Sequence, residues 1–522
     1  MTRSSKWLTA ASALLALTFV HCGGSGSGTD MGPTGSDEGP PPDLGPVPDE
    51  GSGDTSVVEV LQREDLSTFR NFALSADLLD ELGDAPAVTV FAPTEDAWLD
   101  FFTDLGLTEA ALVADVDRLD AFMRYHVVPE RLTPTDLNAP GFASTWAEEG
   151  EGPTVFYRMA TEGLELNGGP GEVTSGGAAV LANEEASNGY VFVIDRVLLP
   201  PSLVDVLRYA RSSDIEGFQD LANAIEARGL GAQLDFDIAT VPIAGLTAFT
   251  LMAPVDSVFP DSPPPANVLL YHVLQEAFAT SELPEFANTQ AAQTFEDGEG
   301  GFVDVPLTMA FDRSTTPIEV NGGPPGQAGD PIGATITIED VRALNGVVHV
   351  IDAVLQPLTL RELLLAAGLD TFSEAATDAA LVPPPWTPGG IGGGDTFSYP
   401  EILEGAPLGG GLTVFAPIDI AFQSVPTDPG ELLFLIAQHI IPGDLPLRVR
   451  DLPTDPAIRL DVVNRDNPRP GLTFEAAAVP PRVTPVSGLG SPGDPANLLN
   501  ADLGATNGIL HTIDVVLEPG TP

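Results

Sequence analysis

The sequence predicts three tandem domains, each containing both helices and strands. The main observation is the stretch Thr-Val-Phe-Ala-Pro at residues 89–93, which comes back with small changes at residues 250–254 and 413–417. The intervals are 161 and 163 residues, and a repeat at near-constant spacing is typical of a tandem array of domains. A length of 522 residues agrees with this, since it suits about three ordinary domains.

Each unit opens on a predicted helix with a capping box. A serine or threonine is followed three residues later by an acidic residue, directly before an apolar run, so that the two residues cap each other's backbone N–H groups. The pairs are Ser56–Glu59, Ser202–Asp205 and Thr359–Glu362. The second and third pairs closely follow the prolines that end the preceding units. Linkers are therefore nearly absent, and the domains are expected to contact one another.

Further apolar patterns predict helices inside the units. Residues 74–82 place four leucines on one stripe, which favours a continuous helix. A second stripe contains Leu119, Phe122 and Met123 and runs into a strand predicted at the following Tyr-His pair. In the second unit, the prolines at 263–265 exclude a helix interior, because proline lacks the N–H and clashes with the preceding turn.

The repeated stretch itself is predicted to be a buried strand. Five residues are enough for a short strand, and the final proline ends it. An acidic or capping residue follows each copy, and a bulky aromatic comes shortly after it. This order predicts a short helical turn with the aromatic ring on its inner face.

Two further motifs share the same period. A Tyr-His pair precedes an apolar run at residues 125–129 and 271–274, and residues 438–442 hold a looser copy with glutamine for tyrosine. Each unit then closes on Asn-Gly, an apolar run and an aspartate, at residues 188–195, 345–352 and 507–514. Asn-Gly ahead of an apolar run predicts a hairpin, because both residues tolerate a positive φ.

Through these three motifs the chain resembles the fasciclin-like domain family. The family pattern is a Thr-Val-Phe-Ala-Pro box, a Tyr-His motif and a closing Asn-Gly-x-x-His-x-Ile-Asp box, and all three units carry versions in this order. The resemblance implies three tandem fasciclin-like domains at residues 54–200, 201–357 and 358–519. For each it implies an α+β fold, with a seven-stranded wedge-like β core and several helices, used outside the cell for adhesion.

The N-terminal residues resemble the signal of a bacterial lipoprotein. Arg3 and Lys6 precede an apolar run, short for a membrane span, that ends just before Cys22, the one cysteine of the chain. We expect residues 1–21 to be a signal peptide and Cys22 to carry a lipid anchor in the cell envelope, with the outer membrane the expected place. The alternative is an ordinary secreted protein. The acidic, Gly/Ser/Pro-rich residues 22–53 are predicted to be a flexible tether.

The charge argues against two kinds of anionic partner. With 21 basic and 75 acidic residues, the formal net charge is −54, which predicts no binding to nucleic acid and no adsorption of the folded domains to anionic lipid. Such a surface is either an adaptation for solubility or a surface whose repulsion divalent cations would relieve. Because there is a single cysteine, no internal disulfide forms, and each domain depends on its core.

The candidate site residues lie in the repeated motifs. They are Tyr125, His126, Tyr271, His272, His349, His439 and His511. They are either binding residues or buried structural residues whose rings are hydrogen-bonded to backbone. Phe192 replaces the closing histidine in the first unit, which favours the structural interpretation. The closing aspartates are expected to accept local backbone hydrogen bonds; they are Asp195, Asp352 and Asp514.

The sequence predicts no enzyme. No metal site or cofactor is expected, because the histidines lack the spacing of metal ligands, and no catalytic residue is expected, because neither a Gly-x-Ser-x-Gly elbow nor a His-Glu-x-x-His motif occurs. The predicted function is adhesion or matrix contact, with a cell-surface or matrix protein or a polysaccharide as partner. The alternatives are a periplasmic or outer-envelope binding module for a glycan or small apolar ligand and, less favoured, an envelope hydrolase.

Overall fold

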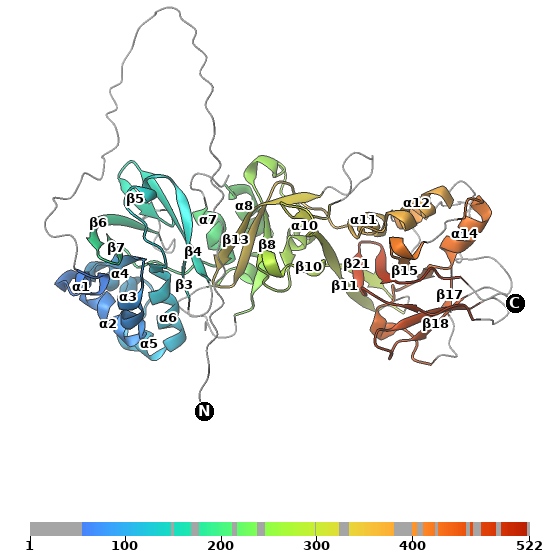
Figure 1. The fold of residues 1–522 in the computed structure, drawn as a ribbon, viewed down its shortest axis with the longest axis horizontal. Helices are drawn as coiled ribbons and strands as arrows, with labels where there is room; N and C mark the ends of the chain where they lie inside the picture. The colour runs from blue at the N-terminus through green and yellow to red at the C-terminus, as the bar shows by residue number, and fades with distance from the viewer. Residues whose placement is uncertain are drawn as a thin grey trace, which may run out of the picture. The chain divides into compact units, whose positions relative to one another are not determined.

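The structure is a computed structural model (Figure 1). It describes residues 55–147, 151–168, 177–210, 217–236, 246–297, 299–322, 333–379, 399–404, 411–422, 426–455, 460–462, 471–486 and 492–518. The predicted signal peptide, the tether and Cys22 lie outside these residues. Within the described part of the chain, every helix is too short or too polar to cross a membrane.

The helices predicted to open the domains are present, each with its capping box. They are α1 (Val57–Val60), α7 (Leu203–Tyr209) and α11 (Leu360–Ala366). At α7, the Ser202 hydroxyl accepts from the Asp205 N–H at 3.1 Å, and the Asp205 carboxylate accepts from the Ser202 N–H at 3.1 Å. A cap of this kind stabilises a helix by about 1 kcal/mol, which matters in helices of one or two turns.

The continuous helix predicted over residues 74–82 is wrong. The segment belongs to two helices, α2 (Ser67–Ser75) and α3 (Leu78–Asp84), separated at Asp77, which has a left-handed φ of 55°. Leu82 is buried, whereas Leu74 is 58% exposed. Aspartate tolerates the left-handed conformation, so the chain turns here and the leucines face two directions.

The first domain combines these helices with a seven-stranded sheet. Its other helices are α4 (Glu95–Asp104), α5 (Glu109–Ala114) and α6 (Val116–Tyr125). The order of strands is β2–β1–β7–β6–β5–β4–β3, with β1 parallel to β7 and all other neighbours antiparallel. The strands are β1 (Val88–Pro93), β2 (Val127–Val128), β3 (Gly141–Trp146), β4 (Glu151–Ala160), β5 (Gly163–Leu166), β6 (Ala178–Ala186) and β7 (Gly189–Ile194). The repeated stretch is β1, and all of it is buried, as predicted.

The second domain closes the same order of strands into a barrel. Its helices after α7 are α8 (Gln219–Ala227), α9 (Gly231–Leu234) and α10 (Ala266–Tyr271), which begins directly after the three prolines. The barrel order is β10–β11–β12–β13–β14–β8–β9. The strands are β8 (Phe249–Pro254), β9 (Val273–Leu274), β10 (Phe286–Glu296), β11 (Phe302–Asp312), β12 (Glu319–Val320), β13 (Ala334–Ala343) and β14 (Gly346–Ile351). A single bridge between Thr289 and Leu274 closes it.

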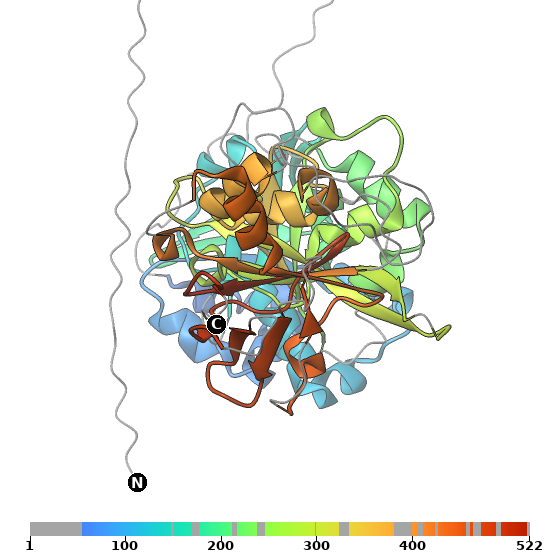
Figure 2. The same ribbon diagram turned by 90° about the vertical axis from the view of Figure 1, so that its right-hand side faces the viewer.

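The third domain keeps the order of strands but forms two four-stranded sheets within its described residues. Helices α12 (Asp370–Ala379), α13 (Tyr399–Leu403) and α14 (Pro429–Ala437) join α11 on one side of β15 (Gly411–Pro417), and β18 (Gly471–Glu475) lies on the other (Figures 1 and 2). The sheets are β16–β15–β22–β21 and β17–β18–β19–β20. The other strands are β16 (Ile440–Gly443), β17 (Leu460–Asp461), β19 (Arg482–Val486), β20 (Ala496–Asn497), β21 (Leu503–Ala505) and β22 (Gly508–Ile513).

One interrupted strand explains why the third domain has two sheets. Strands β20 and β21 together occupy the place of the continuous β13, because β20 pairs with β19 and β21 pairs with β22. The chain leaves the sheet between them, at Asp502, which has a φ of 62°. The seven-stranded order is therefore shared by all three domains, with one strand divided in the last.

The closing hairpins are present, but for a different reason from the one predicted. The closing asparagines Asn188, Asn345 and Asn507 are absent from the residues with positive φ, although Gly346 has a φ of 151°. Instead, Asn188 accepts from the Val57 N–H at 2.9 Å and donates to the Leu82 carbonyl at 2.9 Å, so it joins the opening helix to the closing hairpin. Gly189 is needed because a Cβ there would overlap the Val88 carbonyl oxygen. Asn345 and Asn507 make the equivalent bonds.

Candidate functional site

The tyrosine of each Tyr-His motif ends a helix, and the histidine follows it. Tyr125 is the last residue of α6, and Tyr271 is the last residue of α10. The strand predicted at the pair begins only after the histidine, as β2 and β9. In the third domain, Gln438 and His439 stand in the same place between α14 and β16.

The motif histidines make one common pair of hydrogen bonds. Nδ1 of His126 donates to the Phe122 carbonyl oxygen at 2.7 Å, and Nε2 accepts from the Leu198 N–H at 2.9 Å. His272 bonds Val268 and Leu355 in the same way, and His439 bonds Leu435 and Leu517, at distances of 2.8–3.0 Å. All three rings are fully buried. Each ring therefore ties the end of a helix to the segment that follows the closing strand.

Burial keeps these rings neutral. It lowers the pKa of His126, His272 and His439 to about 4, because a charged imidazole has no water around it. A neutral imidazole has one donor and one acceptor, and both are occupied by backbone groups. No nitrogen remains for a metal ion, a substrate or a partner.

The closing histidines face a bulge in the neighbouring strand. Nε2 of His349 donates to the Phe278 carbonyl oxygen at 3.0 Å, and Nδ1 accepts from the Asp340 N–H at 3.2 Å. The β13–β14 ladder shifts register beside Asp340, which has a φ of 58°. His511 makes the same contacts with Leu447 and Asp502, at 2.9 and 3.2 Å. The bulge therefore turns a backbone N–H toward the ring.

The first domain lacks both the closing histidine and this bulge. Phe192 pairs with Asn183 and Val191 pairs with Glu184, without a register shift between them. The phenyl ring is buried, like the imidazoles of His349 and His511. Histidine and bulge thus occur together in the second and third domains, and both are missing from the first.

Replacing His349 by phenylalanine is expected to lower the free energy of unfolding by about 1–3 kcal/mol, because the Asp340 N–H loses its acceptor and the Phe278 carbonyl its donor. Deleting Asp340 in the same variant removes the bulged residue and its unsatisfied N–H, but also the carboxylate that accepts from Thr280, so it is expected to recover only part of that loss. Urea midpoints measure both effects. A His349→Phe variant as stable as the natural chain would contradict the coupling of histidine and bulge.

The closing aspartates accept local backbone hydrogen bonds, as predicted. Asp195 accepts from the Ala179 N–H at 2.7 Å, Asp352 from Thr335 at 2.6 Å, and Asp514 from Asn497 at 2.7 Å. Each bond joins the end of the closing strand to its hairpin partner. These carboxylates therefore serve the fold.

The hydroxyl of each motif tyrosine is hydrogen-bonded to a buried asparagine, and the sequence did not predict this role. These hydrogen bonds form the tyrosine network. The Tyr125 hydroxyl donates to the Thr154 carbonyl at 3.0 Å and accepts from Asn167 Nδ2 at 2.9 Å. Tyr271 makes the same bonds with Thr308 and Asn321, at 2.7 and 3.0 Å. Both asparagines are buried and precede a glycine, so the repeated Asn-Gly pair was the available signal.

The tyrosine networks lie at the junctions between domains. The Thr154 hydroxyl accepts from the Arg342 N–H of the second domain at 2.9 Å, and the Thr308 hydroxyl accepts from the Gly504 N–H of the third at 2.8 Å. Burial raises the pKa of Tyr125, and the nearby carboxylate of Asp205 raises it further. The two junctions are thus built from equivalent residues, and the expected contact between domains is confirmed.

The described residues contain no group of three or more metal-ligating side chains. The acidic turn near residue 297 is a local structure, in which the Asp297 carboxylate accepts from the N–H groups of Glu299 and Gly301 at 2.9 and 2.7 Å. The predicted site residues are not brought together either, because each domain uses its own histidines separately. The motif residues therefore have the same structural role in each domain.

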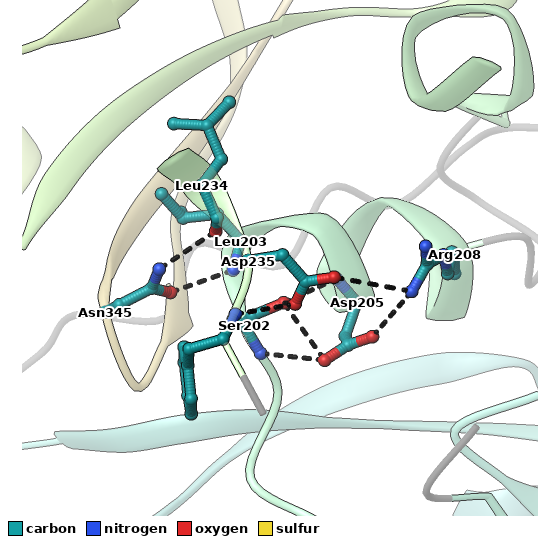
Figure 3. Close-up of polar contacts among 8 residues, drawn as sticks. Ser202, Leu203, Asp205, Arg208, Leu234, Asp235 and Asn345 are labelled. Atoms are coloured by element: carbon teal, nitrogen blue, oxygen red, sulfur yellow. Dashed lines mark hydrogen bonds and ion pairs between the residues drawn. The ribbon is translucent and has the colours of Figure 1, made fainter. Parts of the chain in front are cut away.

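A cavity of about 510 Å³ lies where the first domain meets α7 and α9 of the second. Its apolar lining includes Leu105, Leu199 and Pro200 from the first domain's side. Its charged lining is Asp205, Arg208 and Asp235, which point toward one another in Figure 3. Arg208 Nη1 lies 3.1 Å from Asp205 Oδ1 and 3.9 Å from Asp235 Oδ2. No sequence motif indicates this cavity, because its walls come from separate segments.

Comparison with known proteins agrees with the repeated motifs. The chain matches the fasciclin domain family over residues 64–200, 216–357 and 401–519. It is 24% identical over 490 residues to transforming growth factor-beta-induced protein ig-h3 of Sus scrofa, covering 89% of this chain and 58% of that protein. Protein sll1483 of Synechocystis is 34% identical over 149 residues, covering 28% of this chain and 74% of that protein.

Two further similarities cover parts of the chain. Periostin of Homo sapiens is 29% identical over 212 residues, covering 40% of this chain and 22% of periostin. A solved FAS1 domain pair from the insect cell adhesion molecule Fasciclin I is 18% identical, with a TM-score of 0.32, and the match covers 56% of this chain and 97% of that one. The three matched family segments each contain the strand, the histidine motif and the closing hairpin described above. The chain belongs to the fasciclin domain family, with three domains in tandem.

Proposed function

We propose that this protein mediates adhesion or matrix contact at the cell surface, acting by binding without turnover. The observation that carries the proposal is that the five motif histidines are fully buried and bonded to backbone. A partner therefore meets the outer surfaces of the domains. The fasciclin resemblance supplies the adhesive role, and the expected partner is a cell-surface or matrix protein or a polysaccharide.

The net charge makes such contacts sensitive to ions. A formal charge of −54 repels other acidic surfaces, and the Debye length of about 8 Å in physiological salt screens this only partly. Single exposed pairs contribute only about 0–1 kcal/mol, so the effect comes from the summed field. Added salt or divalent cations should therefore ease close approach.

Attachment of coated beads to cells of the source organism, and to one another, tests the proposal. Beads carrying the chain with the Cys22→Ser change are expected to attach, and attachment should rise with salt and with calcium. Beads coated with a neutral protein are the control. Attachment that is absent under all conditions, or a robust hydrolytic activity of the same preparation, would overturn the proposal.

The anchor is a separate part of the proposal, supported by the leader and by the position of Cys22. One acyl chain binds a membrane only marginally, since each buried methylene contributes about 0.8 kcal/mol, and stable anchoring takes more than one chain. The lipoprotein resemblance implies several. Cys22→Ser is expected to move the protein from the detergent phase to the aqueous phase in a phase-partition assay. Unchanged partitioning would remove the anchor and leave the secreted alternative.

A further inference from the structure

The cavity at the first junction has unequal numbers of positive and negative groups. Two carboxylates, Asp205 and Asp235, share one guanidinium, that of Arg208. Burial raises the pKa of Asp205, and the charge of Asp235 raises it further. The described lining thus carries an excess negative charge inside a partly buried space, which favours a cationic occupant.

The hydrogen bonds at this cavity are also incomplete. The Ser202 hydroxyl lies 3.0 Å from Asp205 Oδ2 and 2.6 Å from Asp235 Oδ1, but its single proton serves only one of them at a time. Asp235 Oδ1 also accepts from the Phe236 N–H at 2.9 Å, whereas Oδ2 has Arg208 only at 3.9 Å. Acceptor capacity is therefore left over on Asp235, whose contacts Figure 3 shows.

Tyr209 supplies a second, independent observation. Its side chain is only 3% exposed and lines the cavity, and its hydroxyl makes no hydrogen bond to any residue in the described part of the chain. Burial raises its pKa, and the negative charge of Asp205 raises it further. A ligand with a donor would give this hydroxyl a hydrogen-bond partner in the cavity.

We propose that this cavity binds a small organic ammonium ion with an apolar body. A primary ammonium has three donors and no acceptor, which matches acceptors on Asp205, Asp235 and Tyr209. Leu105, Leu199 and Phe236 form the apolar wall for the body of the ligand. A volume of about 510 Å³ at a domain junction is in the usual range for small-molecule sites.

The site is specific to the first junction. Counted from the capping boxes, Arg208 and Tyr209 correspond to Leu365 and Ala366 in α11. Leu360, Leu363 and Leu364 of that helix lie in an apolar core shared by the second and third domains. Glu362 keeps a carboxylate in the place of Asp205, but the arginine and the tyrosine have apolar counterparts, so the second junction is not expected to bind amines.

Titration calorimetry of the full chain with n-hexylammonium tests the proposal. The comparison ligands 1-hexanol and hexanoate also carry a six-carbon chain, but their end groups are neutral and negative. Hexylammonium is expected to bind and the other two are not. Asp235→Asn and Tyr209→Phe are each expected to weaken binding by about tenfold or more, the range of one lost polar contact. Asp220→Asn, an exposed aspartate on α8, removes the same charge and should leave binding unchanged.

Thermal unfolding of each variant keeps the test decisive. Tyr209→Phe retains the ring, so a loss of binding without a loss of folding assigns the hydroxyl to the site. Hexylammonium binding that is absent, that equals hexanol binding, or that survives both site variants would overturn the proposal. These outcomes are independent of bead attachment, so failure of the adhesive function is distinguished from failure of this site.

Discussion

Replacing His272 by alanine is expected to lower the free energy of unfolding by about 3–5 kcal/mol, among the largest effects of any single change in this chain. The buried ring connects the Val268 carbonyl to the Leu355 N–H, and alanine leaves both groups without a partner. It also leaves a cavity of the size of the imidazole, whose lining loses its packing contacts.

Two further variants separate these contributions. His272→Phe keeps the volume and loses both hydrogen bonds, so its loss should be smaller, at about 1–3 kcal/mol. Leu99→Ala is the control, because that side chain is 65% exposed and its truncation should change stability by less than about 0.5 kcal/mol. Chemical denaturation measures all three. An unmoved midpoint for His272→Ala, together with lost attachment of coated beads, would make His272 a contact residue.

Acid is expected to destabilise the domains between pH 6.5 and 4. The folded-state pKa of His126, His272 and His439 is about 4, whereas an unfolded histidine has a pKa of about 6.5. The unfolded state binds more protons in this window, so the stabilising contribution is present above pH 6.5 and is lost as the pH falls toward 4. Each ring accounts for up to roughly 3 kcal/mol, and burial lowers the pKa of His349 and His511 in the same direction.

The carboxylates titrate lower on the pH scale, and their shifts differ in sign. Hydrogen bonds from Thr133 lower the pKa of Asp136, whereas burial raises the pKa of Asp205 and Asp370. An ordinary aspartate or glutamate has a pKa of about 4, so most of the negative charge persists down to about pH 5. The free energy of unfolding measured at pH 7.5, 6.5, 5.5 and 5 should therefore fall steadily. His126→Phe should show a shallower slope than the natural chain. Stability that stays constant from pH 7.5 to 5 would show that the rings do not become charged on unfolding.

The parts of the fold that could be predicted from sequence are those fixed by near neighbours. Capping boxes such as Ser56–Glu59, and the buried strand ended by Pro93, depend on residues within one turn or one strand. The helix break at Asp77 was missed because a leucine stripe shows periodicity but not the local left-handed conformation. The divided strand of the third domain was missed because Asp502 leaves the sheet to donate its N–H to His511 on the neighbouring strand, a contact that the apolar pattern does not show.

The candidate residues could be identified because their motifs repeat, but the groups that hydrogen-bond to them could not. The Tyr-His motif is local, whereas Leu198 and Leu355, which bond the rings, lie 72 and 83 residues away. Thr154 and Arg342, which join two domains, are separated by 188 residues. Pairings of this length are set by how whole domains pack, and a single sequence carries no local signal for them.

The difference between the two junctions has a mechanical consequence. The second and third domains share one large apolar core. At the first junction, a single buried residue among those described in the first domain, Phe156, joins the core of the second, and a cavity is lined by residues of both domains. When tension is applied along the chain, the more weakly packed junction separates first, because it has less buried surface to give up. The chain would then lengthen between its first and second domains while every domain stays folded. When the force is removed, the two domains would associate again, so the lengthening would be reversible.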